Sequence, residues 1–267
     1  MEMKDVAMDN EKRLALVEEY DGWFKRKPHK WERVESNELA RHYVIQVLGR
    51  QPMNVIDIGC GNGHTIEYLS KHWQFTQFVG LDLSEVGIEI ANKRNLDRAE
   101  FITGFADLFS MEGEGCFEVA LLLGVAEHFD SPGTVLEHTR KTILDPVGLL
   151  YIECPNCIGY PESEKVEGFR RLAKGSRQVE WHLFRETWEE IITGAGYEIV
   201  ESIKGPRMEN EFIWVVRPSD GAFPVERRCR ECGCTDLNAC VDILGRPCYW
   251  TDEDLCSNCG PRLVSDD

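Results

Sequence analysis

A glycine-rich loop between an apolar strand and a helix constrains this chain more than any other feature. Residues 55–64 read VIDIGCGNGH, with glycines at positions 59, 61 and 63. Glycine lacks a Cβ atom, so such a loop turns tightly and lets a ligand approach the backbone closely. Apolar segments alternate with helical patterns along the chain, which predicts a parallel sheet covered by helices on both faces.

Short apolar segments are predicted to form the strands of this sheet, at residues 54–58, 78–83, 100–103, 118–123, 148–153, 198–203 and 211–216. Spaced apolar residues predict the helices, at residues 12–20, 35–48, 65–71, 85–94, 132–143 and 187–195. The expected fold is an α/β domain with a doubly wound, seven-stranded, mostly parallel sheet. Ligands bind such sheets beyond the carboxyl ends of the strands, where the glycine loop, Asp82, Glu127 and His128 fall.

The residues around the loop favour a positively charged ligand without phosphate. A dinucleotide fingerprint that starts at Gly59 requires glycine at position 64, which is His64. Asp57, beside the loop, would repel a pyrophosphate but attract an ammonium or sulfonium group. Asp82 ends the second strand, 19 residues beyond Gly63, where an acid can accept hydrogen bonds from ribose hydroxyls. S-adenosylmethionine (SAM) has all of these properties.

A structural alternative is that the glycines only form a turn and that Asp82 caps the helix after Ser84. The wider sequence favours the cofactor, because several segments resemble class I SAM-dependent methyltransferases, nearest to the ubiquinone-biosynthesis-type O-methyltransferases. These segments read VIDIGCGNGHTIEYL, VGLDLS, VALLLGVAEHF, GLLYIECPN and HLFRETWEEIITGAGYEIVE. The resemblance covers about residues 30–216. It implies a Rossmann-like methyltransferase fold and an enzyme that moves a methyl group from SAM to an O or N atom of a small or medium acceptor.

The same resemblance implies which residues bind the cofactor. Asp57 and the loop glycines would surround the methionine moiety, Asp82 would hold the ribose, and the residues after the fourth strand would border the transferring methyl group. The full set is Asp57, Gly59, Gly61, Gly63, Asp82, Ala106, Asp107, Gly124 and Val125. Arg33 lies about as far upstream of the loop as a cofactor-contacting arginine of some relatives, although it also reads as an ordinary surface arginine.

One segment departs from the family pattern. Relatives usually have Gly-Asp-Ala after the third strand, with the Asp accepting from the adenine amino group, whereas residues 104–107 here read GFAD. Either Asp107 takes that role from a shifted position, or Phe105 packs against the adenine. The first alternative is slightly favoured.

Two histidines are candidate catalytic bases, which an acceptor needs only if it must lose a proton. His128 follows Glu127 at the rim of the expected site, and His182 follows residues 156–180, which read as an irregular lid over the acceptor. Structural roles remain open for both histidines. Arginines and lysines in the lid either attract an anionic acceptor or form a solvated face. Cys154 and Cys157, a CxxC pair after the fifth strand, are more readily explained as part of a turn than as a metal or redox site.

A cysteine-rich tail follows the expected methyltransferase domain. The chain has 11 cysteines, and the cluster between positions 229 and 259 contains two CxxC pairs. In a reducing compartment such pairs indicate metal rather than disulfides. A structural zinc ion is expected on Cys229, Cys232, Cys256 and Cys259, while Cys234, Cys240 and Cys248 would belong to a second site, or the cluster would hold iron–sulfur. The tail also loosely resembles small cysteine-rich modules of bacteriophage proteins.

The predicted domain organisation is a methyltransferase domain at 1–217, a linker at 218–227 and a cysteine-rich module at 228–262. The formal net charge of −17 argues against a general nucleic-acid coat, because phosphate binding needs a basic face. No secretory signal or membrane span is recognisable, so a cytoplasmic location is expected. A small-molecule acceptor is therefore favoured. Alternatives are methylation of nucleic acid or protein, a scaffold that binds SAM without catalysis, and a protein contact through the tail.

Overall fold

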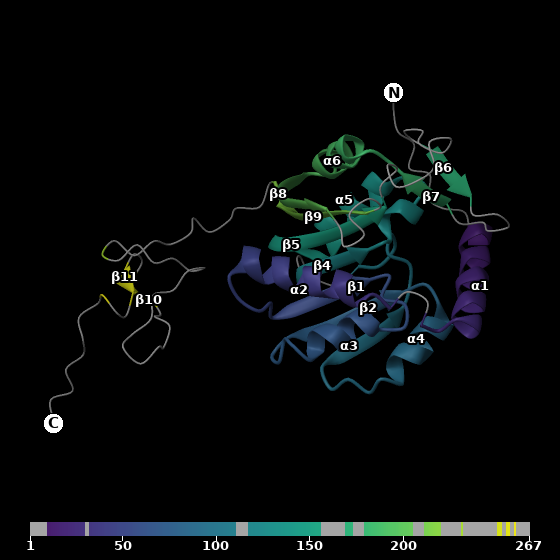
Figure 1. Ribbon diagram of the computed structural model, residues 1–267, viewed down its shortest axis with the longest axis horizontal. Coiled ribbons are helices and arrows are strands. Elements are labelled where there is room, and N and C mark those ends of the chain that lie inside the picture. Colours follow the sequence, from purple (N-terminus) through teal and green to yellow (C-terminus); the bar gives the residue numbers. More distant parts are fainter. Residues whose placement is uncertain are drawn as a thin grey trace.

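The computed structural model describes residues 10–29, 32–110, 117–155, 169–172, 179–204 and 211–219, together with residues 231, 250–252, 255–256 and 259. Its centre is a seven-stranded sheet with helices on both sides (Figure 1). The strands of this sheet are β1 (Asn54–Ile58), β2 (Gln77–Asp82), β3 (Ala99–Thr103), β4 (Phe117–Leu123), β5 (Leu144–Pro155), β8 (Tyr197–Lys204) and β9 (Glu211–Pro218). The helices are α1 (Asn10–Arg26), α2 (Val34–Leu48), α3 (His64–Ser70), α4 (Glu85–Asn92), α5 (Pro132–Thr142) and α6 (Arg185–Gly194).

The strands lie in the order β3-β2-β1-β4-β5-β9-β8. The five strands from β3 to β5 are parallel to their neighbours, and β9 runs antiparallel to both β5 and β8. The predicted doubly wound, mostly parallel, Rossmann-like sheet is therefore confirmed. In this order β1 and β4 are neighbours whose following helices cover opposite faces, and a ligand site forms outside their carboxyl ends.

Two apolar cores form because both faces of the sheet are buried. On β4, Ala120 and Leu122 pack into one core, and Val119 and Leu121 pack into the other. The first core also contains side chains of α5 and α6, and the second contains side chains of α2, α3 and α4. Continuous apolar strands are thus explained by helices on both sides rather than by one wet face.

The segment that the sequence marks as an irregular lid contains a small hairpin. Strands β6 (Phe169–Leu172) and β7 (Val179–His182) pair antiparallel within it. The indole Nε1 of Trp181 donates a hydrogen bond of 2.9 Å to the carbonyl of Phe129, just after the 3-10 helix η1 (Ala126–His128). This bond fixes the hairpin to the chain that follows β4.

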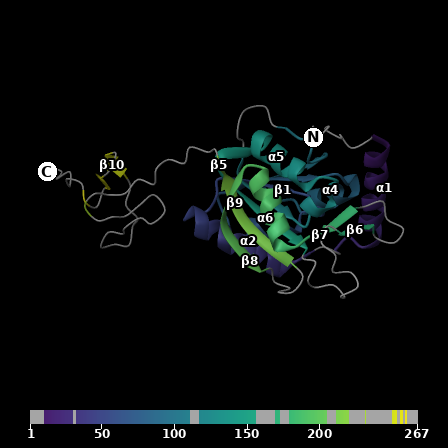
Figure 2. The ribbon, with the colours of Figure 1, turned by 90° about the horizontal axis from the view of Figure 1, so that it is seen from above.

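Helix α1 is longer than predicted and starts the described chain. It packs against α4, and both views place it at the same end of the molecule as the β6–β7 hairpin (Figure 1 and Figure 2). No helix in the described ranges is long and apolar enough to cross a membrane.

Little of the cysteine-rich tail belongs to the described residues. Strands β10 (Trp250–Asp252) and β11 (Leu255–Cys256) pair antiparallel there. Most of the predicted linker at 218–227 lies outside the described residues. The proposed boundaries between domain, linker and tail therefore stay a prediction.

Candidate active site

A cavity of about 590 Å³ opens at the carboxyl ends of β1 to β5. Its walls come from the segments that follow these strands and from the helices that cover them. In sheet order, the lining residues are Phe105 after β3, Asp82 as the last residue of β2, Gly59 after β1, Val125 after β4 and Glu153 on β5. Neighbouring strands lie about 4.8 Å apart, so these five strand ends span about 19 Å. The cavity is thus long enough to place one ligand beside another.

The glycine loop fits closely between two packed side chains. Gly59 has φ 79°, and a Cβ atom added there would lie 2.4 Å from Cγ2 of Val125. Gly61 has φ 53°, and its Cβ would lie 3.0 Å from Cζ of Phe24 on α1. Both positions therefore need glycine for their backbone conformation and for space. The loop leaves a concave strip of bare backbone in the cavity wall.

Asp82 is buried beside this loop and holds its shape. Its Oδ2 accepts a hydrogen bond of 2.8 Å from the backbone N–H of Gly61, and its Oδ1 accepts one of 2.8 Å from that of Ser84. Each carboxylate oxygen can accept a second bond, so a hydroxyl-bearing ligand can still be held. Burial raises the pKa of Asp82 to about 6, although these backbone bonds oppose the shift.

Asp57 lies at the floor of the cavity and is 2% exposed. Its Oδ2 accepts no hydrogen bond from the described residues. Burial, and then the charge of Asp82, raise the pKa of Asp57 to about 7. Two buried carboxylates without a compensating cation are costly, so this floor fits a ligand that brings positive charge.

Asp107, in the segment after β3, is held in place by Arg13 of α1. Its two carboxylate oxygens accept hydrogen bonds of 2.8 and 2.6 Å from the guanidinium of Arg13 on α1. The same guanidinium lies 4.9 Å from the ring centroid of Phe105. Phe105, Ala106 and Asp107 all line the cavity, so both predicted modes of adenine contact remain available. No local pattern predicts the pairing of Asp107 with Arg13, because 94 residues separate the two in the chain.

Helix α1 forms a wall of the cavity that the sequence did not predict. Its apolar side chains Leu16, Tyr20, Trp23 and Phe24 line the space. Asp21 joins α1 to the start of α4, because its Oδ1 accepts from the hydroxyl of Ser84 at 2.5 Å and from the N–H of Val86 at 3.2 Å. A longer amphipathic stretch at residues 10–26 was the available sign, but nothing local indicates which surface such a helix covers.

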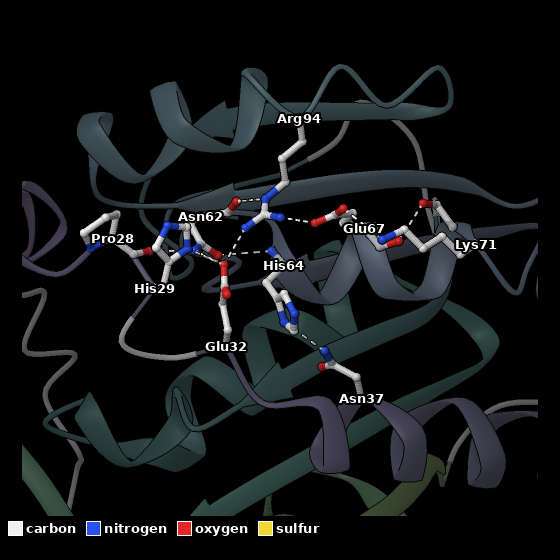
Figure 3. A network of polar contacts seen from close by, with 10 residues as sticks. Pro28, His29, Glu32, Asn37, Asn62, His64, Glu67, Lys71 and Arg94 are labelled. Carbon is white, nitrogen blue, oxygen red and sulfur yellow. Dashed lines mark hydrogen bonds and ion pairs between the residues drawn. The ribbon is translucent and has the colours of Figure 1, made fainter.

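A polar network ties the connection between α1 and α2 to the glycine loop (Figure 3). Glu32 accepts hydrogen bonds from Asn62 at 2.9 Å and from Arg94 at 2.8 Å. Arg94 also donates to the carbonyl of Asn62 at 2.6 Å and pairs with Glu67 on α3. Burial acts to raise the pKa of Glu32, but hydrogen bonds from His29, Arg94 and Asn62 outweigh it and lower the pKa to about 2. Glu32 and Arg94 therefore hold Asn62, and with it the glycine loop, in place.

The end of the cavity at β4 and β5 carries several acidic side chains. Glu127 and Glu153 are both buried and line the cavity, as does His128, whose Nε2 lies 3.8 Å from Oε1 of Glu127. Arg33 donates to Glu153 at 3.2 Å and to Glu211 of β9 at 2.8 Å. Arg33 thus lines the cavity, and its guanidinium binds the carboxylates of Glu153 and Glu211 at the β5 end.

The cavity brings together most of the predicted site residues. Those that line it are Asp57, Gly59, Gly61, Asp82, Ala106, Asp107, Gly124, Val125 and His128. Gly63 is not among the lining residues, and its would-be Cβ meets Phe101 and Ala91 behind the loop. His182 ends β7, is 3% exposed and does not line the cavity. His64, the residue that breaks the dinucleotide fingerprint, does line it.

The predicted zinc ligands cannot be compared as a set. Cys229 and Cys232 lie outside the described residues, Cys256 is on β11, and Cys259 is in a turn. No group of three or more His, Cys, Asp or Glu in the described part of the chain could hold a metal ion. Cys154 of the body is buried, and burial raises the pKa of its thiol well above the usual value, which makes it a poor ligand or nucleophile.

Comparison with known proteins agrees with this geometry. A family described as a methyltransferase domain matches residues 31–202. A ubiquinone biosynthesis O-methyltransferase of Azorhizobium caulinodans is 26% identical over 223 residues, which are 80% of this chain and 81% of that protein. A trans-aconitate 2-methyltransferase of Acidovorax sp. (strain JS42) is 33% identical over 153 residues, 56% of each chain.

A solved structure shows the same fold. The 1,6-didemethyltoxoflavin-N1-methyltransferase of Burkholderia thailandensis, with bound 1,6-didemethyltoxoflavin and S-adenosylhomocysteine, superposes with a TM-score of 0.64. The match covers 81% of this chain and 93% of that one at 21% sequence identity. The described sheet and its helices are therefore those of a widespread α/β architecture.

Proposed function

The chain belongs to the methyltransferase-domain family, and from this premise we propose that it moves the methyl group of SAM to an O or N atom of a small or medium acceptor. The single observation that carries this proposal is the strip of glycine backbone between two buried carboxylates, Asp57 and Asp82, at the carboxyl ends of β1 and β2. A strip of this kind accepts a nucleoside that carries positive charge.

The residues present fit SAM chemically. Asp82 would accept hydrogen bonds from ribose hydroxyls through the lone pairs that Gly61 and Ser84 leave open. Asp57, whose Oδ2 accepts no hydrogen bond within the described structure, would face the charged methionine end. Phe105, Ala106 and Asp107 would contact the adenine, and Gly124 and Val125 would border the methyl group.

A dinucleotide fits these residues poorly. Its pyrophosphate would bring two negative charges to a loop that already lies between Asp57 and Asp82. The charges of the pyrophosphate and of these carboxylates would repel each other strongly, because the buried site screens them less than water does. The loop also has no lysine or arginine among its own residues, 59–63, to offset such a charge.

The chemistry requires little beyond positioning. SAM supplies a methyl group that its sulfonium already activates, and the displacement proceeds when nucleophile, methyl carbon and sulfur lie in line. The chain's own contribution is to hold the partners and to exclude water, for which α1 and its Tyr20 and Trp23 form a cover. For a hydroxyl acceptor, His128 is the proposed proton acceptor, because it lines the cavity. His182 would take this role only after β7 has moved.

A small acceptor is supported by the volume of the cavity and by the relatives. About 590 Å³ holds a nucleoside cofactor and a compact second molecule, but no folded macromolecule. The similar proteins are named for a ubiquinone precursor pathway, trans-aconitate and a toxoflavin precursor, which are small molecules. Nucleic acid and protein remain alternatives that the experiment below distinguishes.

We also propose that the tail, residues 228–262, holds a structural zinc ion on Cys229, Cys232, Cys256 and Cys259. Two CxxC pairs in a short segment with little core support this, since metal binding supplies folding energy. Elemental analysis of the purified chain should find about one zinc per molecule, as one tetrahedral thiolate site requires. A folded tail without metal would contradict the proposal.

Transfer of a radioactive methyl group tests the main proposal. The protein is incubated with SAM labelled in its methyl group and with a lysate separated into small molecules, nucleic acid and protein. Label is expected to enter the small-molecule fraction, and the variant Asp82→Ala should transfer far less. Label in the nucleic acid or protein fraction would contradict the small acceptor, and no transfer to any fraction would contradict the enzyme.

A further inference from the structure

The two ends of the cavity differ in what they offer a ligand. A cofactor that uses the glycine loop, Asp82 and the segment after β3 occupies the strand ends of β1, β2 and β3. The remaining wall belongs to β4 and β5, where Glu127, His128 and Glu153 line the space. The carbonyl of Glu153 accepts a hydrogen bond of 2.8 Å from the N–H of Gly124, so Glu153 lies beside the residue that borders the methyl group.

Glu153 is a built binding group rather than a surface acid. It is 1% exposed, yet its residue lines the cavity. Its Oε1 accepts from the hydroxyl of Ser36 at 3.1 Å and from Nη1 of Arg33 at 3.2 Å. Its Oε2 accepts no hydrogen bond from the described residues. A buried carboxylate oxygen without a donor is costly, and a donor on the acceptor would remove that cost.

The charges around Glu153 favour a donor that is neutral or positive. Nη1 of Arg33 is shared with Glu211, which lies 2.8 Å away and is itself buried. Glu127 on η1 adds a further carboxylate. Among the described lining residues the acids Asp57, Asp82, Glu127 and Glu153 outnumber lysine and arginine, which are represented by Arg33, while a fifth acid, Asp107, is paired with Arg13. An anionic acceptor would add to this excess of negative charge. A hydroxyl acceptor would do the same once it had lost its proton to become the nucleophile, whereas an amine attacks through a neutral lone pair.

We propose that the acceptor is an amine that is uncharged at the working pH, whose N–H group donates to Oε2 of Glu153, and that Glu153 takes the proton released by methylation. This rests on the proposed function and narrows its acceptor class. The nitrogen lone pair forms the new N–C bond while the C–S bond breaks, and the breaking pair stays on sulfur. The nitrogen then carries a positive charge, and its N–H proton moves to the carboxylate.

The surroundings of Glu153 suit it for this proton transfer. Burial, and then the charge of Glu211, raise its pKa to about 7, whereas Arg33 and Ser36 oppose the shift and Glu127 adds to it. A base works best when its pKa is near the working pH. The methyl transfer rate should therefore rise with pH and level off once Glu153 has lost its proton.

The chemical nature of the labelled product tests this proposal. SAM with a ¹³C-labelled methyl group and a small-molecule extract are incubated with the protein, and the product is separated from unreacted SAM by chromatography. The carbon chemical shift of the new methyl group is expected to be that of a methyl bonded to nitrogen. Label in an ester or ether would overturn the proposal while leaving the methyltransferase intact. No label in any fraction would overturn the proposed function and this inference with it.

Matched variants test the role of Glu153 itself. Glu153→Gln should lower kcat by about 100-fold or more, the usual contribution of a general base, while calorimetry shows S-adenosylhomocysteine binding as in the wild type. Glu211→Gln, which does not line the cavity, should move the acid limb of the pH profile to lower pH. Glu198→Gln, at a surface ion pair with Arg217, is the control. A larger loss in His128→Asn than in Glu153→Gln, or an unmoved pH limb in Glu211→Gln, would overturn the assignment.

Discussion

The glycine loop has left-handed backbone at Gly59 and Gly61 and lies beside two buried carboxyl groups, those of Asp57 and Asp82. Gly59 turns the chain where Val125 leaves no space for a side chain, and Asp82 ties the loop to the turn before α4. The sequence predicted the glycine turn and the acid beside it, because glycine spacing and an acid at the end of the second strand are local signals, but it did not predict the contact with Val125. It could not predict that Arg13 holds Asp107 or that Arg33 lies on Glu153, because both contacts join segments far apart in the chain.

Substitution of Gly59 tests the space and strain at the loop. Gly59→Ala places a Cβ atom 2.4 Å from Cγ2 of Val125 at a positive φ, so the loop must move. A left-handed backbone alone costs an alanine about 1–2 kcal/mol, and the close contact adds to that cost. Urea unfolding should therefore show a clear loss of stability, and calorimetry a loss of SAM binding.

Gly194→Ala is the matched control for this change. A Cβ at Gly194, the last residue of α6, meets nothing within 4 Å. Because alanine favours helix, this variant should be as stable as the wild type or slightly more stable. Equal effects of the two substitutions would refute the close fit at Gly59.

Asp57 makes a pH-dependent contribution to stability in the protein without ligand. Its pKa rises from 3.8 to about 7 on folding, because burial and then Asp82 disfavour the charged form. The folded state thus binds the proton more tightly, so this contribution is full below about pH 4 and is lost as pH rises through about 7. The difference in unfolding free energy, Asp57→Asn minus wild type, should grow from pH 4 to pH 8.

The exposed Asp97 provides the control for that experiment. The unfolding free energy of Asp97→Asn, measured by urea unfolding at each pH, should differ from that of the wild type by the same amount across the whole range. A difference between Asp57→Asn and the wild type that stays constant with pH would show that Asp57 does not titrate as described.

At the scale of elements, the sequence predicts the strands of the sheet well, but it predicts poorly the β6–β7 hairpin and helix α1. The five parallel strands appear within a few residues of their predicted ranges, since each is a short apolar run bounded by polar turns. The β6–β7 hairpin was missed, because FRRL lacks a regular alternation of apolar residues and VEWH, which does alternate, is only four residues long. Helix α1 was predicted too short, and its position over the cavity depends on contacts that no local pattern encodes.

The contact between α1 and α4 can be tested through Asp21. Asp21→Ala removes the acceptor for the Ser84 hydroxyl and the Val86 N–H, which should weaken the attachment by about 1 kcal/mol. Hydrogen exchange of the backbone amides of residues 10–26 is then expected to accelerate, and the affinity for SAM is expected to fall. If exchange speeds up only at the start of α4, Asp21 serves as a cap for that helix and does not hold α1 in place.

At the scale of the whole molecule, the order of the strands decides what the cavity can bind. Because β1 lies between β2 and β4, the glycine loop faces the carboxylate of Asp82 on one side and the β4–β5 end on the other. The sequence predicted the fold class and this crevice from alternating apolar segments. It left the acceptor open, since the wall at the β4–β5 end is assembled from α2, η1 and β5, which only the folded chain brings together.

Calorimetric titration of the wild type and of Asp82→Asn with S-adenosylhomocysteine, SAM and a nicotinamide dinucleotide tests the cofactor most directly. The wild type is expected to bind SAM and its demethylated product at one site per chain. Asp82→Asn should bind them at least about tenfold more weakly, a difference of about 1.4 kcal/mol. Asp97→Asn should bind as the wild type does. Absence of heat with SAM at millimolar concentration, or tighter binding of the dinucleotide, would contradict a cavity shaped for a phosphate-free, positively charged nucleoside.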